Sequence, residues 1–540
     1  MLPFCQIMSG FFTRLPKLQR SSLGQRILSC LLVAALCWNV FPRVAFARTD
    51  AAQTSPQTSQ SGLSVQPYLD RVVDRVTEFT LTNGLKFIVL ERHQAPVVSF
   101  LTYADVGGAD EPNRQTGVAH FLEHLAFKGT TRIGTTNYTV EQKLLDRLDA
   151  LDTQIQKAKT AGKTEEAARL QAEFEQVEAE AAKLVEQNEL GRIVEQSGGV
   201  GLNANTSTDA TRYFYSFPSN KLELWMSLES ERFLDPVFRE FYKEKDVILE
   251  ERRLRVDNSP IGTLVEAMLD KAFQVHPYRR PVIGYNQDIR NLTRENVQKF
   301  FETYYVPNNL TIAIVGDVNP PEVKRLAEIY FGRYKAGSKP PQVTAVEPPQ
   351  KESREVTLRL PAQPLYMAGY HRPGVNHPDH VIYELINSIL SDGRTSRLYK
   401  SLVEQQRVAL TAQGFSGFPG SKFPNLLVLY AVTAPGRTVD EVARSLDTEI
   451  ERLRTEPVAA SELERVKTQA RAALLRSLTS NMGMAQLLLE YEVKTGSWRN
   501  LFKELDAIAA VTPADIQRVA RSTFRPENRT VAKLLSAEKK

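Results

Sequence analysis

The spacing of apolar side chains changes along the chain, and each spacing predicts a different kind of element. Two alternating runs flank Asn83-Gly84, a dipeptide typical of a hairpin turn, and an alternating run at 97–108 predicts a third strand. Apolar residues at helical intervals predict helices at 222–238 and 241–256. Two further strands are predicted at 201–217 and 308–318.

Residues 141–190 have a pattern of their own and are rich in Glu, Ala, Lys, Gln and Leu. Leu148 and Leu151 before a break at 161–163, and Leu170 after it, belong to apolar runs with helical spacing. This pattern predicts an inserted antiparallel helical hairpin whose apolar stripe is the seam between its two helices. A stripe that binds a partner helix is the alternative.

The two halves of the chain resemble each other. The segment that starts at Leu292 and the segment that starts at Val511 share residues in register over 24 positions, at a constant offset of 219. Such an offset predicts an α+β fold made of two duplicated α+β domains, each a mixed or antiparallel sheet packed with helices. The matching pairs are Thr293 with Thr512, Gln298 with Gln517, Pro307 with Pro526, Asn309 with Asn528, and Thr311 with Thr530.

Changes in composition set the expected boundaries. Residues 336–355 are rich in proline and charge and are predicted to be a linker. The N-terminal domain is therefore expected at 73–335, and the C-terminal domain at 356–540. Residues 1–47 resemble a signal peptide because basic residues precede a short apolar run and an Ala-Phe-Ala cleavage pattern. Residues 48–72 are polar and are predicted to be a flexible tether.

The predicted signal peptide, residues 1–47 (the leader), also changes what the net charge implies about binding partners. The net charge is +5, but residues 1–47 hold five basic residues and no acid, so the remaining chain is neutral. This balance gives no support to nucleic-acid binding. All three cysteines lie in the leader, so the mature chain is expected to have no disulfide. We expect export across the inner membrane to the periplasm, with an uncleaved membrane anchor as the alternative.

The stretch GVAHFLEHLAFKGT at 117–130 holds the strongest chemical signal. On a helix, His120, Glu123 and His124 share one face, because positions three and four apart are neighbours. Two imidazoles one turn apart are spaced to bind one Zn²⁺, and the carboxylate beside them can accept the proton of an attacking water. The alternative is a pair of helix histidines satisfied by hydrogen bonds alone.

A catalytic zinc site usually has three protein ligands, so a third must come from elsewhere in the chain. The acidic helix at 241–256 offers Glu244, Glu250 and Glu251. Glu244 and Glu251 lie two turns apart on one face, whereas Glu250 points away and is expected to meet solvent or Arg252. Spacing alone leaves the choice open.

The sequence resembles the pitrilysin/insulinase (M16) family of zinc metallopeptidases, and most closely its bacterial members built like mitochondrial processing peptidase. The resemblance implies that Glu251 is the third zinc ligand and that Glu244 supports a histidine ligand or the proton path. It also implies that Asn203 and the Ala204 backbone contact the substrate. The matching stretches are GVAHFLEHLAFKGT, LNANTSTDATRY, SLESERFLDPVF, KEKDVILEERR, HPYRRPVIG and YYVPNNLTIAIVGDV.

This chain departs from the family pattern in two places. The interval from His124 to Glu251 is longer than usual, and the hairpin at 141–190 accounts for the excess. An Arg/Tyr pair that binds substrate in many active members is missing, because the aligned positions are Val403 and Leu410. The resemblance therefore implies a zinc-bearing subunit that pairs with an M16-like subunit carrying the Arg/Tyr pair. A homodimer is the alternative.

Together these features predict a zinc-dependent endopeptidase that hydrolyses peptides or unfolded polypeptide segments, with one Zn²⁺ per chain. The competing interpretations are a non-catalytic M16-like scaffold and a subunit that only binds peptide or stores metal. Both predict that no peptide is cleaved.

Overall fold

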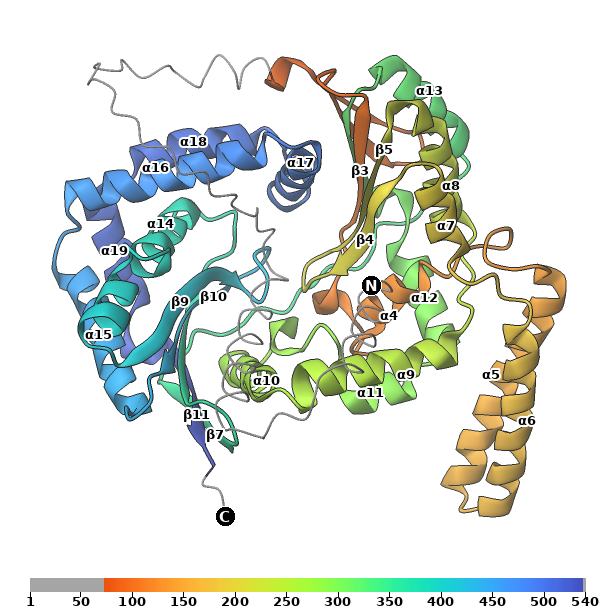
Figure 1. Cartoon of the computed structure of the whole chain (residues 1–540), viewed down its shortest axis with the longest axis horizontal. Helices are drawn as coiled ribbons and strands as arrows, with labels where there is room; N and C mark the ends of the chain where they lie inside the picture. The colour runs from red at the N-terminus through yellow and green to blue at the C-terminus, as the bar shows by residue number, and fades with distance from the viewer. Residues whose placement is uncertain (1–71, 538–540) are drawn as a thin grey trace, which may run out of the picture. The chain divides into compact units, whose positions relative to one another are not determined.

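The computed structural model describes residues 72–537, so the predicted signal peptide and nearly all of the predicted tether lie outside the described residues. Two mixed β-sheets organise the described chain (Figure 1). The first has six strands in the order β1-β2-β6-β3-β5-β4: β1 (Val76–Thr80), β2 (Lys86–Glu91), β3 (Val97–Ala104), β4 (Val200–Thr206), β5 (Thr211–Pro218) and β6 (Leu310–Gly316). The second has five in the order β7-β11-β8-β10-β9: β7 (Arg354–Leu360), β8 (Leu365–Arg372), β9 (Ala409–Phe418), β10 (Asn425–Thr433) and β11 (Arg529–Ser536).

The second sheet repeats the pairing of the first, which confirms the predicted duplicated α+β fold. In each sheet one parallel pair, β2 with β6 or β7 with β11, is followed by three antiparallel neighbours. The central strands β6 and β11 each follow a helix, α12 (Arg294–Tyr304) or α19 (Pro513–Thr523). Thr293 and Thr512, which the offset aligned, both cap these helices through capping boxes. Within the described residues, the first sheet has one more strand than the second, namely β1.

The helices cover both faces of the first sheet. One face packs against α4 (Val118–Leu125), α8 (Leu222–Leu234), α12 and α13 (Pro320–Tyr330). The opposite face packs against α17 (Asn481–Thr495) and α18 (Asn500–Ala510), which belong to the second half of the chain. Conversely, α10 (Pro260–Ala272) from the first half contacts β7 and β11 of the second sheet. The two halves therefore exchange helices (Figure 1).

The other helices complete the covering layers. None of the described helices combines the length and the apolar character that crossing a membrane requires. The remaining helices are α5 (Tyr138–Thr160), α6 (Thr164–Ala182), α7 (Glu189–Gln196), α9 (Phe241–Arg252), α11 (Asn286–Asn291), α14 (His380–Ser391), α15 (Val439–Thr455) and α16 (Ala460–Ser477).

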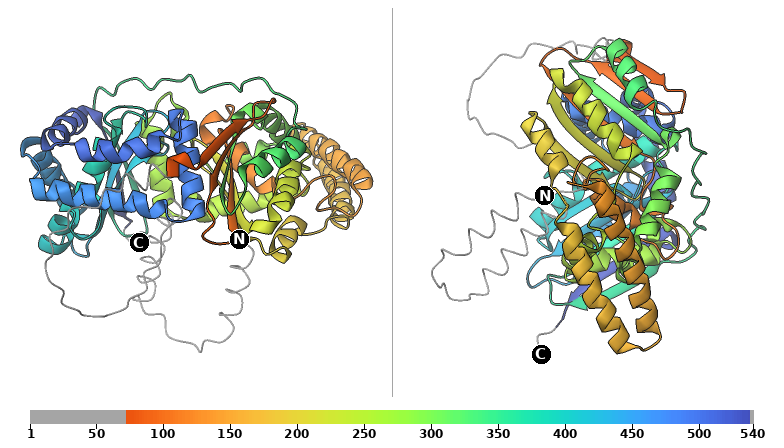
Figure 2. Two further views of the ribbon diagram at one scale, coloured as in Figure 1. Left: turned by 90° about the horizontal axis from the view of Figure 1, so that it is seen from above. Right: turned by 90° about the vertical axis from the view of Figure 1, so that its right-hand side faces the viewer.

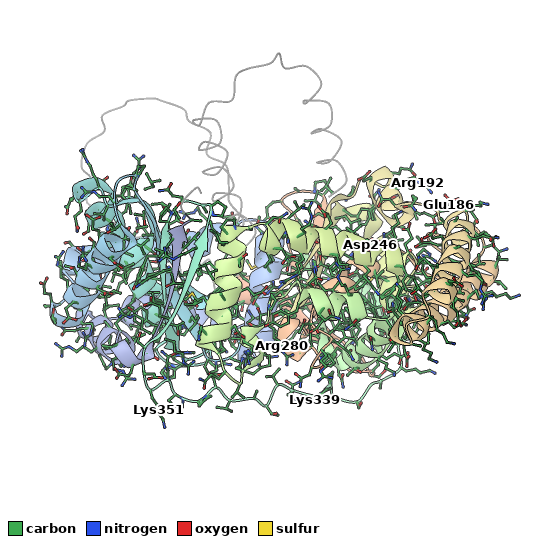
Figure 3. The ribbon with its side chains drawn as sticks, turned by 90° about the horizontal axis from the view of Figure 1, so that it is seen from below. Glu186, Arg192, Asp246, Arg280, Lys339 and Lys351 are labelled. Carbon is green, nitrogen blue, oxygen red and sulfur yellow. The ribbon has the colours of Figure 1, made fainter. Side chains whose placement is uncertain are left out.

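Residues 336–353 contain neither helix nor strand. This segment, inside the predicted linker, passes from the first half of the chain to the second as a long extended stretch (Figure 2). Lys339 and Lys351 mark its course among the drawn side chains (Figure 3). Residues 354–355, which the sequence assigned to the linker, already belong to β7.

Two element boundaries differ from those that the sequence predicts. Residues 201–217 form two antiparallel strands, β4 and β5, rather than one. The turn between them lacks the Asn-Gly signal, and Ser207 closes it by donating its backbone N–H to the Ala210 carbonyl at 2.8 Å. The helical hairpin begins earlier and ends earlier than 141–190, because α5 and α6 span 138–182 and α7 is a separate helix.

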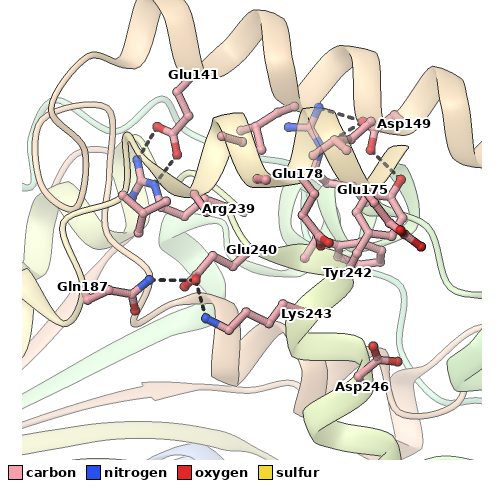
Figure 4. Close-up of a pocket in the computed structure, with 18 residues that line it drawn as sticks. Glu141, Asp149, Glu175, Glu178, Gln187, Arg239, Glu240, Tyr242, Lys243 and Asp246 are labelled. Atoms are coloured by element: carbon pink, nitrogen blue, oxygen red, sulfur yellow. Dashed lines mark hydrogen bonds and ion pairs between the residues drawn. The ribbon is translucent and has the colours of Figure 1, made fainter. Parts of the chain in front are cut away.

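The hairpin α5–α6 projects from the body as an arm (Figure 1), and its apolar stripe is the seam between its helices. Its base is tied to the start of α9 around a cavity of about 360 Å³ (Figure 4). The Tyr242 hydroxyl donates to Asp149 Oδ1 at 3.0 Å, and the Tyr242 ring meets Phe174 edge-on at 4.9 Å. The arm is thus fastened directly to the helix that carries Glu244 and Glu251.

The fully buried Arg239 guanidinium is the strongest polar anchor of the arm. Arg239 Nε donates to Glu141 Oε1 at 2.8 Å, and Nη2 donates to the Thr130 carbonyl at 2.7 Å. Both side chains of this ion pair are 0% exposed. A buried pair of this kind is costly to break, because removing one partner leaves an uncompensated charge.

Replacing Glu141 by glutamine is therefore expected to lower the free energy of unfolding by about 3 kcal/mol. Chemical denaturation followed by circular dichroism would measure this change. Glu173→Gln is the matched control on the same arm, since Glu173 pairs with Arg147 at the surface and its side chain is 42% exposed. Its loss should change stability by less than about 0.5 kcal/mol. Equal losses in both variants would contradict the proposed anchor.

Candidate metal and peptidase site

The helix α4 is fixed by its sequence in a buried position. Its apolar face, which includes Val118, Phe121 and Leu122, packs in the first core. Gly117 precedes it with a φ of 90°, and a Cβ there would lie 2.7 Å from the Ile283 carbonyl oxygen, so only glycine fits. Glu111 caps the helix, because its two carboxylate oxygens accept the Gly117 and Ala119 N–H groups at 2.9 and 3.0 Å.

The opposite face of α4 meets α9. His120 Nε2 lies 3.8 Å from Glu251 Oε2, and His124 Nε2 lies 3.6 Å from the same oxygen. The ligand atoms of His120, His124 and Glu251 all lie within 4.8 Å of one another. These separations are too long for hydrogen bonds, but they suit donors that share one ion. Two imidazole nitrogens and one carboxylate oxygen are also a donor set that Zn²⁺ accepts.

Glu244 lies behind this cluster rather than in it. His124 Nδ1 is 2.8 Å from Glu244 Oε1. Because a carboxylate only accepts, Nδ1 carries the hydrogen, and Nε2 is the ring nitrogen that faces Glu251. The other Glu244 oxygen pairs with Lys128 Nζ at 2.7 Å. Burial alone would raise the pKa of Glu244, but the contacts with His124 and Lys128 outweigh it and lower that pKa to about 2.

Glu250 lies outside the cluster, although it adjoins Glu251 in sequence. Its side chain is 51% exposed, in agreement with the expected contact with solvent, and its ion-pair partner is Arg253 rather than Arg252. Arg252 is buried and instead pairs with Glu266 at 2.9 Å. The 241–256 segment continues past α9 as a π-helical turn at Arg253–Asp257.

The hydrogen bond of His124 to Glu244 distinguishes the pKa values of the two buried histidines. Burial first, and then the neighbouring His124, lower the pKa of His120 well below its usual value. For His124, burial also opposes the charged form, but the hydrogen bond to Glu244 and the nearby carboxylates raise its pKa overall. His120 therefore stays neutral, in the form that can donate a lone pair.

Glu123 extends from the same helix toward the edge strand β4. Its Oε2 accepts a hydrogen bond from the Thr206 hydroxyl at 2.6 Å. Burial raises the pKa of Glu123, and the contact with Thr206 moderates that rise. A carboxyl group with a raised pKa suits proton transfer near neutral pH.

Asn203 and Ala204 lie in the middle of β4, an edge strand that pairs only with β5 in the described sheet. The Asn203 side chain is exposed, and its Oδ1 accepts the Ala204 N–H at 2.9 Å. The structure thus places both residues on the strand that carries Thr206, whose side chain contacts Glu123.

The candidate Arg/Tyr positions in the second half carry no such pair. Leu410 lies on the edge strand β9 and is 46% exposed, whereas Val403 packs against the second core. The nearby Arg397 forms a two-point ion pair with Glu462, at 2.8 Å for the closer contact. This arginine therefore braces α16.

Sequence reasoning missed four residues at the site: Glu111, Lys128, Thr206 and Arg255, whose Nη1 lies 2.9 Å from Glu251 Oε1. Glu111 precedes the helix it caps, so a capping signal could have pointed to it. Lys128 follows His124 by four positions, a spacing that could have suggested a shared partner. Thr206 gave no signal, because its contact with Glu123 depends on how β4 packs beside α4.

Two family models match the chain. The model "Insulinase (Peptidase family M16)" matches residues 86–147 and 174–285, and the model "Peptidase M16 inactive domain" matches residues 291–470. The first model therefore covers the residues that meet at the candidate metal cluster. Its interruption, between 147 and 174, falls within the arm α5–α6.

Individual relatives agree with these models. "Zinc protease PqqE" of Helicobacter pylori is 27% identical over 84% of this chain and 90% of its own length. The crystal structure of a protease from Helicobacter pylori has a TM-score of 0.72 at 26% identity and covers 85% of this chain and 99% of its own. The periplasmic protease PqqL from Escherichia coli shares the fold, with a TM-score of 0.64 at 16% identity over 86% of this chain and 48% of its own.

A Pseudomonas fluorescens structure named "peptidase M16 inactive domain" has the same fold, with a TM-score of 0.69 at 15% identity over 86% of this chain and 98% of its own. Proteins that share this fold therefore include domains named inactive. The fold alone does not establish activity, so the chemistry must be argued from the site residues. The family itself follows from the two models, the relatives named zinc proteases and the shared two-sheet fold: the chain belongs to the M16 peptidase family.

Proposed function

We propose that this protein is a zinc-dependent endopeptidase that hydrolyses peptides or unfolded polypeptide segments. The observation that carries the proposal is the meeting of His120, His124 and Glu251 around one point, with Glu123 on the same face of α4. A protein with the same fold but without peptidase activity would not need these four side chains to meet. The names of the zinc protease relatives support the same reaction class.

In this proposal His120, His124 and Glu251 hold the metal, and Glu244 orients His124 through Nδ1. Bound zinc supplies a Lewis acid that lowers the pKa of water toward ~7 and polarises the scissile carbonyl. Glu123 accepts a proton from the attacking water on its carboxylate and then delivers that proton to the leaving amine.

The substrate is proposed to bind as an additional strand along β4. This strand is at the sheet edge, where a peptide can pair with its outer backbone groups once Asn203 Oδ1 releases the Ala204 N–H. Asn203 and Ala204 would then contact the peptide near the scissile bond. Backbone pairing gives affinity with little demand on sequence, which suits a peptidase of unfolded segments.

We further propose that the chain functions as the zinc-bearing member of a pair. Val403 and Leu410 occupy the positions of the Arg/Tyr pair, and Arg397 is already engaged by Glu462. A relative in Schizosaccharomyces pombe is named "Probable mitochondrial-processing peptidase subunit beta", and this chain matches about half of PqqL. An M16-like subunit that carries the Arg/Tyr pair is the proposed partner, and a homodimer is the alternative.

The proposed location is the periplasm. The support is the signal-peptide pattern of residues 1–47, together with the fold shared with PqqL, which is named a periplasmic protease. Retention of the leader as a membrane anchor is the alternative, and N-terminal sequencing of the native protein separates the two.

The function is tested by zinc removal and restoration. The protein, purified alone and with any co-purifying subunit, is treated with a chelator and assayed on an internally quenched peptide. Cleavage is expected to disappear with the chelator and to return with one equivalent of Zn²⁺. If the zinc-loaded protein cleaves no peptide in either preparation, a scaffold or peptide-binding role replaces the proposal.

A further inference from the structure

The proposed function leaves Thr206 without a role, although its side chain makes the closest contact to Glu123. The Thr206 hydroxyl lies 2.6 Å from Glu123 Oε2 and 3.5 Å from the Thr211 hydroxyl. Thr211 in turn donates its own proton to the Val106 carbonyl at 3.0 Å. Thr206 has one proton to donate, and the short contact to a carboxylate is the stronger of its two options.

The strand end that carries Thr206 is held firmly. Asp209, in the turn directly after β4, accepts hydrogen bonds from the Tyr278 hydroxyl at 2.5 Å and from the Ser421 and Lys422 N–H groups at 2.7 and 3.0 Å. The side chain of Asp209 is 2% exposed. Residues from the second half of the chain therefore fix the turn from which Thr206 reaches Glu123.

Thr206 also lies on the proposed substrate strand. It follows Asn203 and Ala204 on β4, where its backbone pairs with Thr211 of β5. One strand thus provides both the edge for the peptide and the donor that fixes the base. We propose that Thr206 is a positioning residue, which holds Oε2 of Glu123 so that Oε1 faces the peptide bond of a substrate aligned on β4. This inference rests on the proposed function of Glu123.

A structural role alone would make Thr206 important for folding or metal binding, but not for turnover in particular. The proposal instead predicts a loss of kcat with little change in KM, because the peptide still pairs with β4 while the base is misplaced. Two matched pairs isolate the hydroxyl. Threonine and valine have the same shape, and serine and alanine both lack the γ-methyl group of threonine. The two members of each pair therefore differ only in the hydroxyl group.

The experiment measures kcat, KM, bound zinc and the thermal midpoint for Thr206→Val, Thr206→Ser and Thr206→Ala in the zinc-loaded protein. We expect the Val and Ala variants to lose about 10- to 100-fold in kcat, with KM within about twofold and zinc content unchanged. The Ser variant should keep kcat within about threefold of the wild type. Ser207→Ala is the control, since it removes the neighbouring hydroxyl, which donates to the Ala210 carbonyl and not to Glu123.

The outcomes separate this inference from the proposed function. If Glu123→Gln remains active, the proposed function fails first. If Glu123→Gln is inactive but the Val and Ala variants retain the kcat of the wild type, the positioning role of Thr206 is wrong. It is also wrong if serine performs no better than alanine. Should the Val variant fail to fold, the comparison of serine with alanine decides the question by itself.

Discussion

Replacing Glu123 by glutamine is expected to lower the kcat of peptide hydrolysis by about 10³-fold. Glutamine keeps the size of the side chain and can still accept the hydrogen bond from Thr206, but it cannot take a proton from water. The measurement is turnover of a quenched peptide at saturating substrate. Zinc content should stay at one ion per chain, because Glu123 is not among the residues that meet at the metal cluster.

This result would separate proton transfer from metal binding. A fall in both activity and zinc content would mean that the substitution had disturbed α4, in which case Glu123→Asp would show whether a carboxylate restores either property. Unchanged turnover in Glu123→Gln, with zinc present, would remove Glu123 from the mechanism.

The neighbouring glutamates of α9 offer the sharpest test of the metal site. Glu251→Gln should weaken zinc affinity by more than about 100-fold, because a ligand oxygen is exchanged for a weakly coordinating amide. Competition with a chromophoric chelator measures the affinity directly. Glu250→Gln is the matched control, since Glu250 is the next residue, has the same side chain and pairs only with Arg253 at the surface. Its zinc affinity should match the wild type.

The opposite pattern would overturn the assignment. If Glu250→Gln lost zinc and Glu251→Gln did not, α9 would be rotated by about 100° from the arrangement described. If both variants kept zinc, the third ligand would come from another element. Neither outcome depends on peptidase activity, so the metal site can be tested before a substrate is known.

Much of this site could be predicted from the sequence because its signals are local. The spacing of His120, Glu123 and His124 is set within one turn of a helix, and a helix fixes which side chains share a face. The duplication was also visible, because its aligned residues include the helix caps Thr293 and Thr512. The spacing of Glu244 and Glu251 restricted the third ligand, but the choice between them required the family resemblance.

The remaining features depend on contacts between distant segments. Thr206 contacts Glu123 only because β4 lies beside α4, and the spacing of residues in the sequence does not indicate that these two elements pack together. The β4–β5 turn was missed because the backbone of Ser207 closes it and Asp209 holds it through Ser421 and Lys422, which are 212 and 213 residues away. No pattern in the sequence indicated that α17, from the second half of the chain, would cover one face of the first sheet.

The exchange of helices between the halves makes each half depend on the other for the cover of its sheet. Helices α17 and α18 shield an apolar face of the sheet that supports the histidines, while α10 is committed to the other sheet. Each half therefore supplies a covering layer for the other half's sheet, and neither half is expected to stay folded when expressed alone.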